Sequence, residues 1–347
     1  MTSAPVRPPR LRPGDTVAVV STSWGGPSVF PGVFGRGVDV LRRVFGLQVR
    51  EMSTTRMLPE ELIADPRRRA DELNAAFADS SVAAIFMSIG GIDSVRILPF
   101  LDPALARASP KILLGFSDST TQTTFYNQAG LVTFNGPSVM AGFAQIEAFP
   151  DAVSHVRSVL FEPSASLEYA PFGEWVGGYP SWTDPANAGA VAERQAHDGW
   201  RWLQGSARVE GRLFGGCADV LEMMKSTAFW PSASFWDGRL LFLETSEDVP
   251  PPDQVSNWLR NYGMQGVFDR VAALLIGRPR GYDDASTARL DELAVKVVAG
   301  EFGRPDLPIV SGLDFGHTDP QWVLPLGVLA SVDPVVRSIR LEEPAVT

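Results

Sequence analysis

Lys111-Ile112-Leu113-Leu114-Gly115-Phe116-Ser117-Asp118 is a run of apolar residues that ends in small and polar ones. It predicts a buried strand over residues 112–116. A helix is expected over residues 119–129, followed by another apolar strand over 131–134. Strand, helix and strand in succession predict a parallel sheet covered by helices, with reactive loops at the carboxyl ends of the strands.

The same alternation extends toward the N-terminus. Short apolar strands are expected over residues 16–20, 47–49 and 82–87. Asp65-Pro66 has the residue types of a helix cap and first helical position, and predicts a helix that runs to residue 78. These elements predict an N-terminal α/β domain, which we place at residues 1–165.

Regular periodicity is lost between residues 162 and 209, where the chain is rich in Pro, Gly, Ser and Trp. A long irregular segment in a compact protein is usually functional or a linker. We therefore assign residues 166–208 to a Trp-rich linker or substrate loop. Strands and helices resume afterwards, and residues 209–347 are expected to form a second, mixed α/β domain.

Composition excludes several classes of partner. Hydrophobic residues make up 45% of the 347 residues and charged residues 20%, which is typical of a folded globular protein. The net charge of -10 opposes binding to a nucleic-acid polymer. No secretory or membrane-spanning apolar run is visible, and the single cysteine, Cys217, fits a reducing compartment. We expect a cytoplasmic protein with no membrane partner.

Ser117 is the candidate nucleophile. It stands where the strand over residues 112–116 gives way to a helix, which is the position of the serine in a nucleophile elbow. The match to the G-x-S-x-G pattern is incomplete, because Ser119 replaces the second glycine. Taken alone, Ser117 fits a helix-capping serine better than a nucleophile.

A nucleophilic serine needs a base, usually a histidine, and this chain has three histidines. His155 and His197 are interpreted as surface or packing residues. His317 lies in a loop that contains two glycines before it, Gly312 and Gly316, which can let the backbone bring an imidazole into a cleft. A loop histidine bonded to a neighbouring aspartate is an equally good interpretation of the local sequence.

Backbone and carboxylate groups that could complete the site also follow apolar runs. Glu244 comes directly after such a run and could orient the imidazole, and a salt-bridged or capping glutamate is the alternative. Gly90 and Gly91 follow the strand over residues 82–87 and, together with the N–H of Asp118, could form an oxyanion hole. A plain strand-to-helix turn is the alternative for the two glycines.

Patterns for cofactors and metals are missing from the sequence. There is no G-x-G-x-x-G after the first strand and no G-x-x-x-x-G-K-[ST], and no pair of His or Cys residues has the spacing of a zinc site. We expect no cofactor and no metal.

Several sequence blocks together resemble the LD-carboxypeptidase and microcin-immunity family of serine peptidases. They cover nearly the whole chain, and their joint order is more specific than any single block. In order along the chain, they are Ser88-Ile89-Gly90-Gly91, Arg96-Ile97-Leu98-Pro99-Phe100-Leu101-Asp102, Gly115-Phe116-Ser117-Asp118, Asn135-Gly136-Pro137-Ser138-Val139-Met140, Gly211-Arg212-Leu213-Phe214-Gly215-Gly216-Cys217, Leu243-Glu244, Gly277-Arg278 and Gly316-His317-Thr318.

The resemblance implies a fold, a triad and an assembly. The fold is a flavodoxin- or Rossmann-like parallel-sheet domain followed by a mixed α/β domain of the swivelling-barrel type. The residues of the triad correspond to Ser117, Glu244 and His317, so the active site would lie between the domains. Members of the family are cytoplasmic, metal-independent and usually homodimeric.

Two branches of the family differ in substrate, which in either case is a small molecule. One branch removes a terminal D-amino acid from murein peptides, and the other cleaves the amide between an aminoacyl group and a nucleotide. The Trp-rich segment resembles the second branch, with Trp182 as a platform for the base and Gly90 beside the substrate. Trp182 packed at the domain junction is a close alternative, and a non-catalytic binding protein is a rival of another class.

Overall fold

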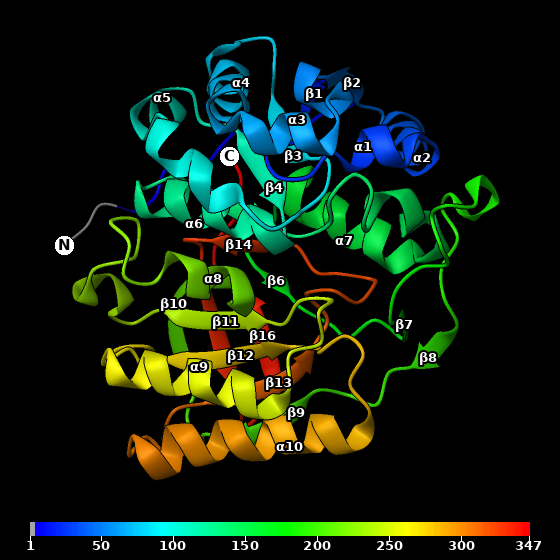
Figure 1. Cartoon of the computed structure of the whole chain (residues 1–347). Helices are drawn as coiled ribbons and strands as arrows, with labels where there is room; N and C mark the ends of the chain where they lie inside the picture. The colour runs from blue at the N-terminus through cyan, green and yellow to red at the C-terminus, as the bar shows by residue number, and fades with distance from the viewer. Residues whose placement is uncertain (1–3) are drawn as a thin grey trace.

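The computed structural model describes residues 4–347, and its strands form three sheets of six, eight and two strands (Figure 1). The six-stranded sheet has the order β14-β5-β4-β3-β1-β2, and its first five strands in the sequence are all parallel. Its parallel part therefore has the 2-1-3-4-5 order of flavodoxin-like folds. The strands are β1 (Thr16–Val20), β2 (Gln48–Glu51), β3 (Ala84–Met87), β4 (Ile112–Gly115), β5 (Thr133–Asn135) and β14 (Leu324–Leu326).

Helices cover this sheet, and prolines in their first turns explain where several of them begin. Proline lacks the N–H that has no partner in the first helical turn, so it is favoured there. Asp65 also caps one helix by accepting the N–H of Arg68 at 2.9 Å. The helices are α1 (Gly26–Val29), α2 (Pro31–Arg43), α3 (Pro59–Ala64), α4 (Pro66–Ala78), α5 (Pro103–Ala108), α6 (Thr120–Gln128) and α7 (Pro150–Leu160).

The eight-stranded sheet has the order β6-β16-β15-β10-β11-β12-β13-β9. Its four central strands, β10 to β13, run parallel, and the outer strands pair antiparallel. The strands are β6 (Leu167–Glu168), β9 (Arg201–Gln204), β10 (Val209–Cys217), β11 (Leu240–Glu244), β12 (Ala273–Gly277), β13 (Ile309–Leu313), β15 (Leu329–Asp333) and β16 (Ser338–Leu341). The helices of this half are α8 (Ala218–Met224), α9 (Pro252–Met264) and α10 (Asp284–Val295), and the small third sheet pairs β7 (Glu174–Val176) with β8 (Arg194–Ala196).

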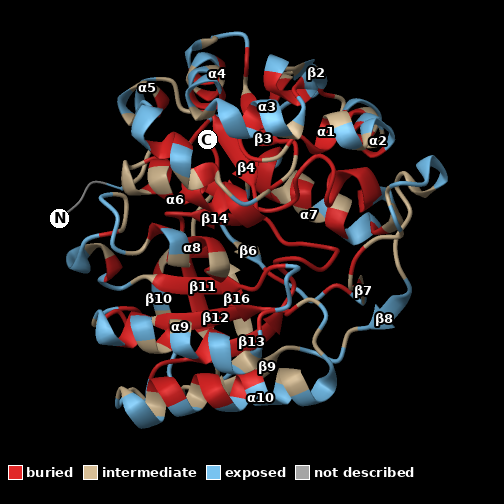
Figure 2. Cartoon of the chain, in the orientation of Figure 1, coloured by how far each residue is buried: buried red, intermediate tan, exposed pale blue. Residues whose placement is uncertain are grey.

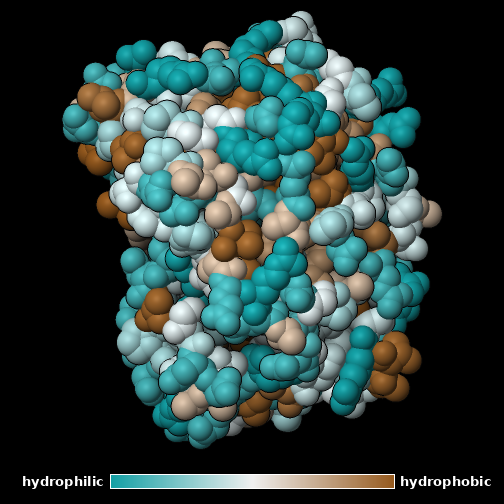
Figure 3. All heavy atoms as spheres, turned by 90° about the vertical axis from the view of Figure 1, so that its right-hand side faces the viewer, coloured by the Kyte–Doolittle hydropathy of each residue, from teal (hydrophilic) through white to brown (hydrophobic). Residues whose placement is uncertain are grey.

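The core lies along the central strands, which Figure 2 shows in red. Every residue of β3, β4, β11, β12 and β13 is buried. The face in Figure 3 is mostly hydrophilic, with apolar side chains in scattered groups, as is normal for a globular surface. Within residues 4–347, no helix has both the length and the apolar character needed to cross a membrane.

The α/β fold expected from the sequence is confirmed, but the chain does not divide cleanly at residue 209. β14, from the C-terminal part, pairs antiparallel with β5 and completes the first sheet. It carries Pro325, which an edge strand tolerates because one side of its backbone has no partner strand. In addition, β6 and β9, which lie within the segment expected to be irregular, are strands of the second sheet.

Candidate active site

Ser117 stands in a strained turn directly after β4. Its φ is +59°, a left-handed conformation that residues other than glycine rarely adopt, and it opens the 3-10 turn Ser117–Ser119 that leads into α6. Such strain in the turn between a strand and a helix is characteristic of a nucleophile elbow. Ser117 is therefore not a helix cap, because Phe116 occupies the cap position of this turn.

Gly115 provides the space that the second glycine of the elbow pattern would otherwise provide. A Cβ at Gly115 would lie 2.6 Å from Cγ of Met87 and 3.0 Å from Cβ of Ser119. The first glycine of the pattern thus provides the space that the close approach of strand and helix needs. Ser119 fits for this reason.

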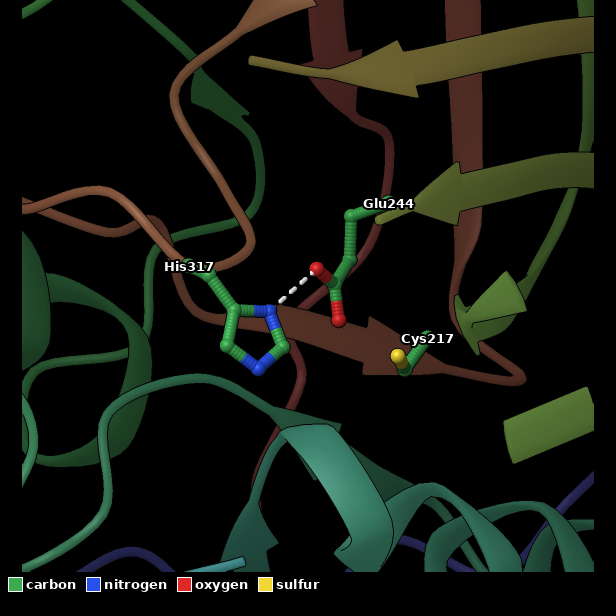
Figure 4. Close-up of side chains that lie close together, drawn as sticks. All are labelled: Cys217, Glu244 and His317. Carbon is green, nitrogen blue, oxygen red and sulfur yellow. Dashed lines mark hydrogen bonds and ion pairs between the residues drawn. The ribbon is translucent and has the colours of Figure 1, made fainter. Parts of the chain in front are cut away.

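Ser117, His317 and Glu244 form one hydrogen-bonded chain. Nε2 of His317 lies 3.1 Å from Oγ of Ser117. On the other side of the ring, Nδ1 lies 2.7 Å from Oε2 of Glu244, the pair that Figure 4 draws. Glu244 is the last residue of β11, and His317 lies in the loop after β13. This is the arrangement in which a carboxylate orients an imidazole and the imidazole can accept a serine proton.

Glycines allow the imidazole to approach Glu244. Gly316 has a φ of +103°, and a Cβ there would lie 2.8 Å from Cβ of Glu244. A Cβ at Gly277, which ends β12, would lie 3.0 Å from the same atom. Side chains at either position would separate the groups that the two strands and the loop bring together.

The two halves of the molecule touch next to this chain of groups. The N–H of Cys217, at the end of β10, donates to Oγ1 of Thr120 at 3.0 Å, and Thr120 is the first residue of α6. A Cβ on Gly216 would lie only 2.5 Å from Cγ2 of Thr120. The turn that carries Ser117 is therefore packed directly against the sheet that carries Glu244.

A second carboxylate, Glu247, was missed as a site residue by the sequence analysis. Its Oε2 lies 2.8 Å from Nε2 of His317, on the side of the ring that faces Ser117. Burial alone would lower the pKa of His317, but Glu244 and Glu247 outweigh it and raise that pKa to about 10. The hydrogen bond from His317 lowers the pKa of Glu247 to about 2. The only sign in the sequence that Glu247 belongs to the site was its position three residues after Glu244.

Gly90, Gly91 and the backbone of Asp118 lie around Ser117. A Cβ at Gly90 would stand 2.7 Å from Oγ of Ser117 and 3.2 Å from the backbone nitrogen of Asp118. Gly91 has a φ of +153°, and a Cβ there would clash with Oγ of Ser23. The Asp118 carboxylate is buried and accepts the N–H of Ser94 at 2.9 Å, which fixes the turn.

A pocket of about 660 Å³ opens over Ser117 and His317. One wall is aromatic. Trp182 stacks on Tyr179 with ring centroids 5.4 Å apart and meets Phe30 edge-on at 5.7 Å. The lining also includes two side chains of opposite charge, Glu247 and Arg280. Trp182 is half-buried and lines the pocket, so it packs at the junction and also faces the site.

Cys217, Glu244 and His317 are the group of three potential metal ligands in residues 4–347 whose ligand atoms all lie within 4.8 Å of one another (Figure 4). Two of the three belong to the hydrogen-bonded chain above, so an ion there would remove the base. The other histidines pack elsewhere. Nε2 of His155 accepts the N–H of Val323 at 2.9 Å, and Nδ1 of His197 accepts the N–H of Gly199 at 2.7 Å.

Two family models match the chain in succession. Residues 17–136 match the N-terminal domain of LD-carboxypeptidase, and residues 210–332 match its C-terminal domain. The chain belongs to the LD-carboxypeptidase family. Both matches include residues of the hydrogen-bonded chain, with Ser117 in the first and Glu244 and His317 in the second.

Full-length relatives of this LD-carboxypeptidase family member carry two kinds of name. A putative carboxypeptidase of Vibrio cholerae is 28% identical over 95% of this chain and 96% of its own. The microcin C7 self-immunity protein MccF of Escherichia coli is 27% identical over 98% and 97%. The solved structure of MccF in complex with aspartyl sulfamoyl adenosine superposes with a TM-score of 0.86, at 27% identity, covering 99% of this chain and 100% of that one. The chain is accordingly a hydrolase of the peptidase class.

Proposed function

We propose that this hydrolase cleaves the amide between an aminoacyl group and a nucleotide, with Ser117 as nucleophile, His317 as base and Glu244 as the group that orients the base. The observation that carries the proposal is the continuous path from Ser117 Oγ through His317 to Glu244, at 3.1 and 2.7 Å, below a large pocket. Nucleophile and base are within hydrogen-bond reach, as this chemistry requires.

The reaction follows from these positions. Oγ of Ser117 attacks the carbonyl carbon while its proton passes to Nε2 of His317, and Glu244 stabilises the imidazolium through Nδ1. The N–H groups of Asp118 and Gly91 receive the oxyanion. Breakdown of the intermediate expels the nitrogen of the leaving group, which takes the proton from His317. Water, deprotonated by the same imidazole, then releases the acid and restores Ser117.

The aromatic wall supports a nucleotide as the leaving portion. Trp182, Tyr179 and Phe30 present flat apolar surface at the side of the pocket, and aromatic rings bind nucleobases by stacking. One face of the Trp182 ring packs against Tyr179, so a nucleobase would stack on the part of the ring that Tyr179 does not cover. The complex of MccF with aspartyl sulfamoyl adenosine supports the same substrate class.

Release of a D-amino acid from a murein tetrapeptide is the second candidate, and Arg280 favours it. Its guanidinium lines the pocket, and in residues 4–347 it makes no hydrogen bond or ion pair. A free C-terminal carboxylate would be a suitable partner, because arginine binds carboxylates in a fork of two hydrogen bonds.

Hydrolysis assays separate the two candidates. Wild-type and Ser117→Ala protein are incubated with an aminoacyl sulfamoyl adenosine and, separately, with a murein tetrapeptide, and the released amino acid is measured by mass spectrometry. Serine-dependent release from the nucleotide supports the first candidate, and release from the tetrapeptide alone supports the second. Release that survives Ser117→Ala would refute the triad.

Ser119→Ala is the matched control, because Ser119 is a buried serine two residues away whose hydroxyl has no hydrogen-bond partner in residues 4–347. It should retain activity. The homodimer and the cytoplasmic location implied by the family resemblance stay predictions. Light scattering of the purified protein and fractionation of cells test them.

A further inference from the structure

Both nitrogens of the His317 ring face a carboxylate. Nδ1 lies 2.7 Å from Glu244, and Nε2 lies 2.8 Å from Glu247. A neutral imidazole carries only one N–H. If Nδ1 holds it, Nε2 presents a lone pair to the Glu247 carboxylate, which is repulsive. This arrangement is therefore that of an imidazolium, with Glu247 bound to the nitrogen that Ser117 needs.

Catalysis requires this arrangement to change. His317 must lose a proton before it can accept one from Ser117, and two carboxylates would then surround a neutral ring. A cation that binds beside Glu247 can replace the positive charge of the imidazolium. His317 can then release its proton to solvent without leaving the Glu247 carboxylate unpaired. Glu247 is free to take such a partner, because its side chain is 54% exposed and, within residues 4–347, it has no ion pair except with His317.

The position of Glu247 identifies the cation. Ser117 Oγ and Glu247 Oε2 are both within hydrogen-bond distance of the same nitrogen of His317. In an α-aminoacyl substrate, the amino nitrogen is two bonds from the carbonyl carbon that Ser117 attacks. When that carbon meets Oγ, the amino group is therefore within reach of the Glu247 carboxylate. A free α-amino group is largely cationic near neutral pH.

We propose that Glu247 is a binding subsite for the free α-ammonium group of the acyl residue, and that this group draws Glu247 away from His317 and so frees the base. The inference rests on the proposed function, since it concerns the acyl half of the same substrate. It names a substrate class: acyl residues with an unblocked α-amine. In a murein tetrapeptide, the α-nitrogen next to the scissile bond is an uncharged amide, so Glu247 favours the aminoacyl substrate over the peptide.

Arg280 lines the same pocket and acts on Glu247 electrostatically without a hydrogen bond to it. It does not replace the ammonium, because a cation that stays in place cannot couple the release of His317 to the arrival of substrate. Asp93, the remaining acid of the lining, is already paired with Arg69 at 2.7 Å and Arg96 at 2.9 Å.

The test compares an aminoacyl sulfamoyl adenosine with its desamino analogue, in which hydrogen replaces the amino group and no bulk is added. Wild-type protein should hydrolyse the amine with a kcat/KM roughly 10- to 100-fold higher, the range of a charge-assisted hydrogen bond. In Glu247→Gln the ratio should fall toward one. Asp248→Asn, on the exposed neighbouring carboxylate, is the matched control and should keep the wild-type ratio.

Binding to Ser117→Ala protein, measured by calorimetry, separates this inference from the proposed function because it needs no turnover. Tighter binding of the amine, lost in Ser117→Ala combined with Glu247→Gln, supports the subsite. Equal binding of both ligands would overturn the Glu247 subsite and leave the proposed function standing. If neither ligand bound, the proposed function would fall, and the inference with it.

Discussion

Ser117 and His317 are separated by 200 positions in the chain, yet Oγ of the serine lies 3.1 Å from Nε2 of the histidine. The two residues follow parallel strands of different sheets, β4 and β13. Because reactive loops gather at the carboxyl ends of parallel strands, two such edges can share one site. The chemistry proposed for the pocket therefore depends on how the two sheets meet.

The pH dependence of hydrolysis should reflect the glutamates around His317. The base must be neutral, so activity on a substrate without an α-amine should rise with pH toward the pKa of about 10. Glu247→Gln removes one of the two carboxylates that raise this pKa and should move the acidic limb of the profile to lower pH. A kcat/KM profile between pH 6 and 10 measures the shift. An unmoved limb would mean that Glu247 does not act on the base.

The same shift has a consequence for stability. The pKa of His317 is raised from 6.5 to about 10, so its ionisation stabilises the folded state fully below pH 6.5, and this contribution is lost as the pH rises through 10. The loss of stability between pH 7 and 10 should be smaller in Glu247→Gln than in wild type. Urea unfolding at several pH values compares the two slopes.

Gly90→Ala should inactivate the enzyme without unfolding it. The new Cβ would stand 2.7 Å from Oγ of Ser117, where it forces the hydroxyl away from His317 or closes the space for substrate. A displacement of about 1 Å can cost roughly 100-fold in rate, so at least that loss of kcat/KM is expected. Gly32→Ala is the control, since a Cβ there meets nothing within 4 Å. Wild-type activity in Gly90→Ala would contradict the placement of substrate beside this glycine.

Trp182→Ala should weaken the binding of a nucleotide ligand. Loss of one stacking surface costs about 1–3 kcal/mol, which corresponds to a Kd roughly 5- to 150-fold higher. Trp182→Phe keeps a ring against Tyr179 and should lose less. Calorimetric titration with AMP measures all three proteins. If Trp182→Ala binds AMP as wild type does, Trp182 only packs the junction.

Ser117→Gly should be more stable than Ser117→Ala. The left-handed φ of +59° costs an L-residue roughly 1–2 kcal/mol, and glycine avoids this cost. Both variants lack the nucleophile, so the comparison concerns the backbone alone. Urea unfolding should show the glycine variant stabler by about 1 kcal/mol. Equal stabilities would mean that the turn relaxes when the serine is absent.

Several parts of the fold and site could be predicted because they are local. The strand over residues 16–20 and the helix over 66–78 coincide with β1 and α4, since apolar periodicity and the Asp65-Pro66 start depend only on nearby residues. Ser117 was singled out by its place after a buried strand. The family resemblance then selected Glu244 and His317 from among groups that local sequence left ambiguous.

Other features could not be predicted because they arise from contacts between distant segments. β14 belongs to the first sheet, although the strands before and after it in the sequence, β13 and β15, belong to the second. Glu247 contacts His317 only because the loops after β11 and β13 lie side by side. Tyr179 lines the pocket beside Trp182, and of these two residues the family resemblance had pointed only to Trp182.

The sequence by itself determined the parallel strands of the first sheet, where loops leave their carboxyl ends, and which chemical groups those loops carry. Only the tertiary structure decided which groups meet: a serine with a histidine, and that histidine with two glutamates instead of one. The physical reason is that periodicity records which face of each element is buried, whereas a hydrogen bond of about 3 Å depends on the packing of two whole sheets against each other.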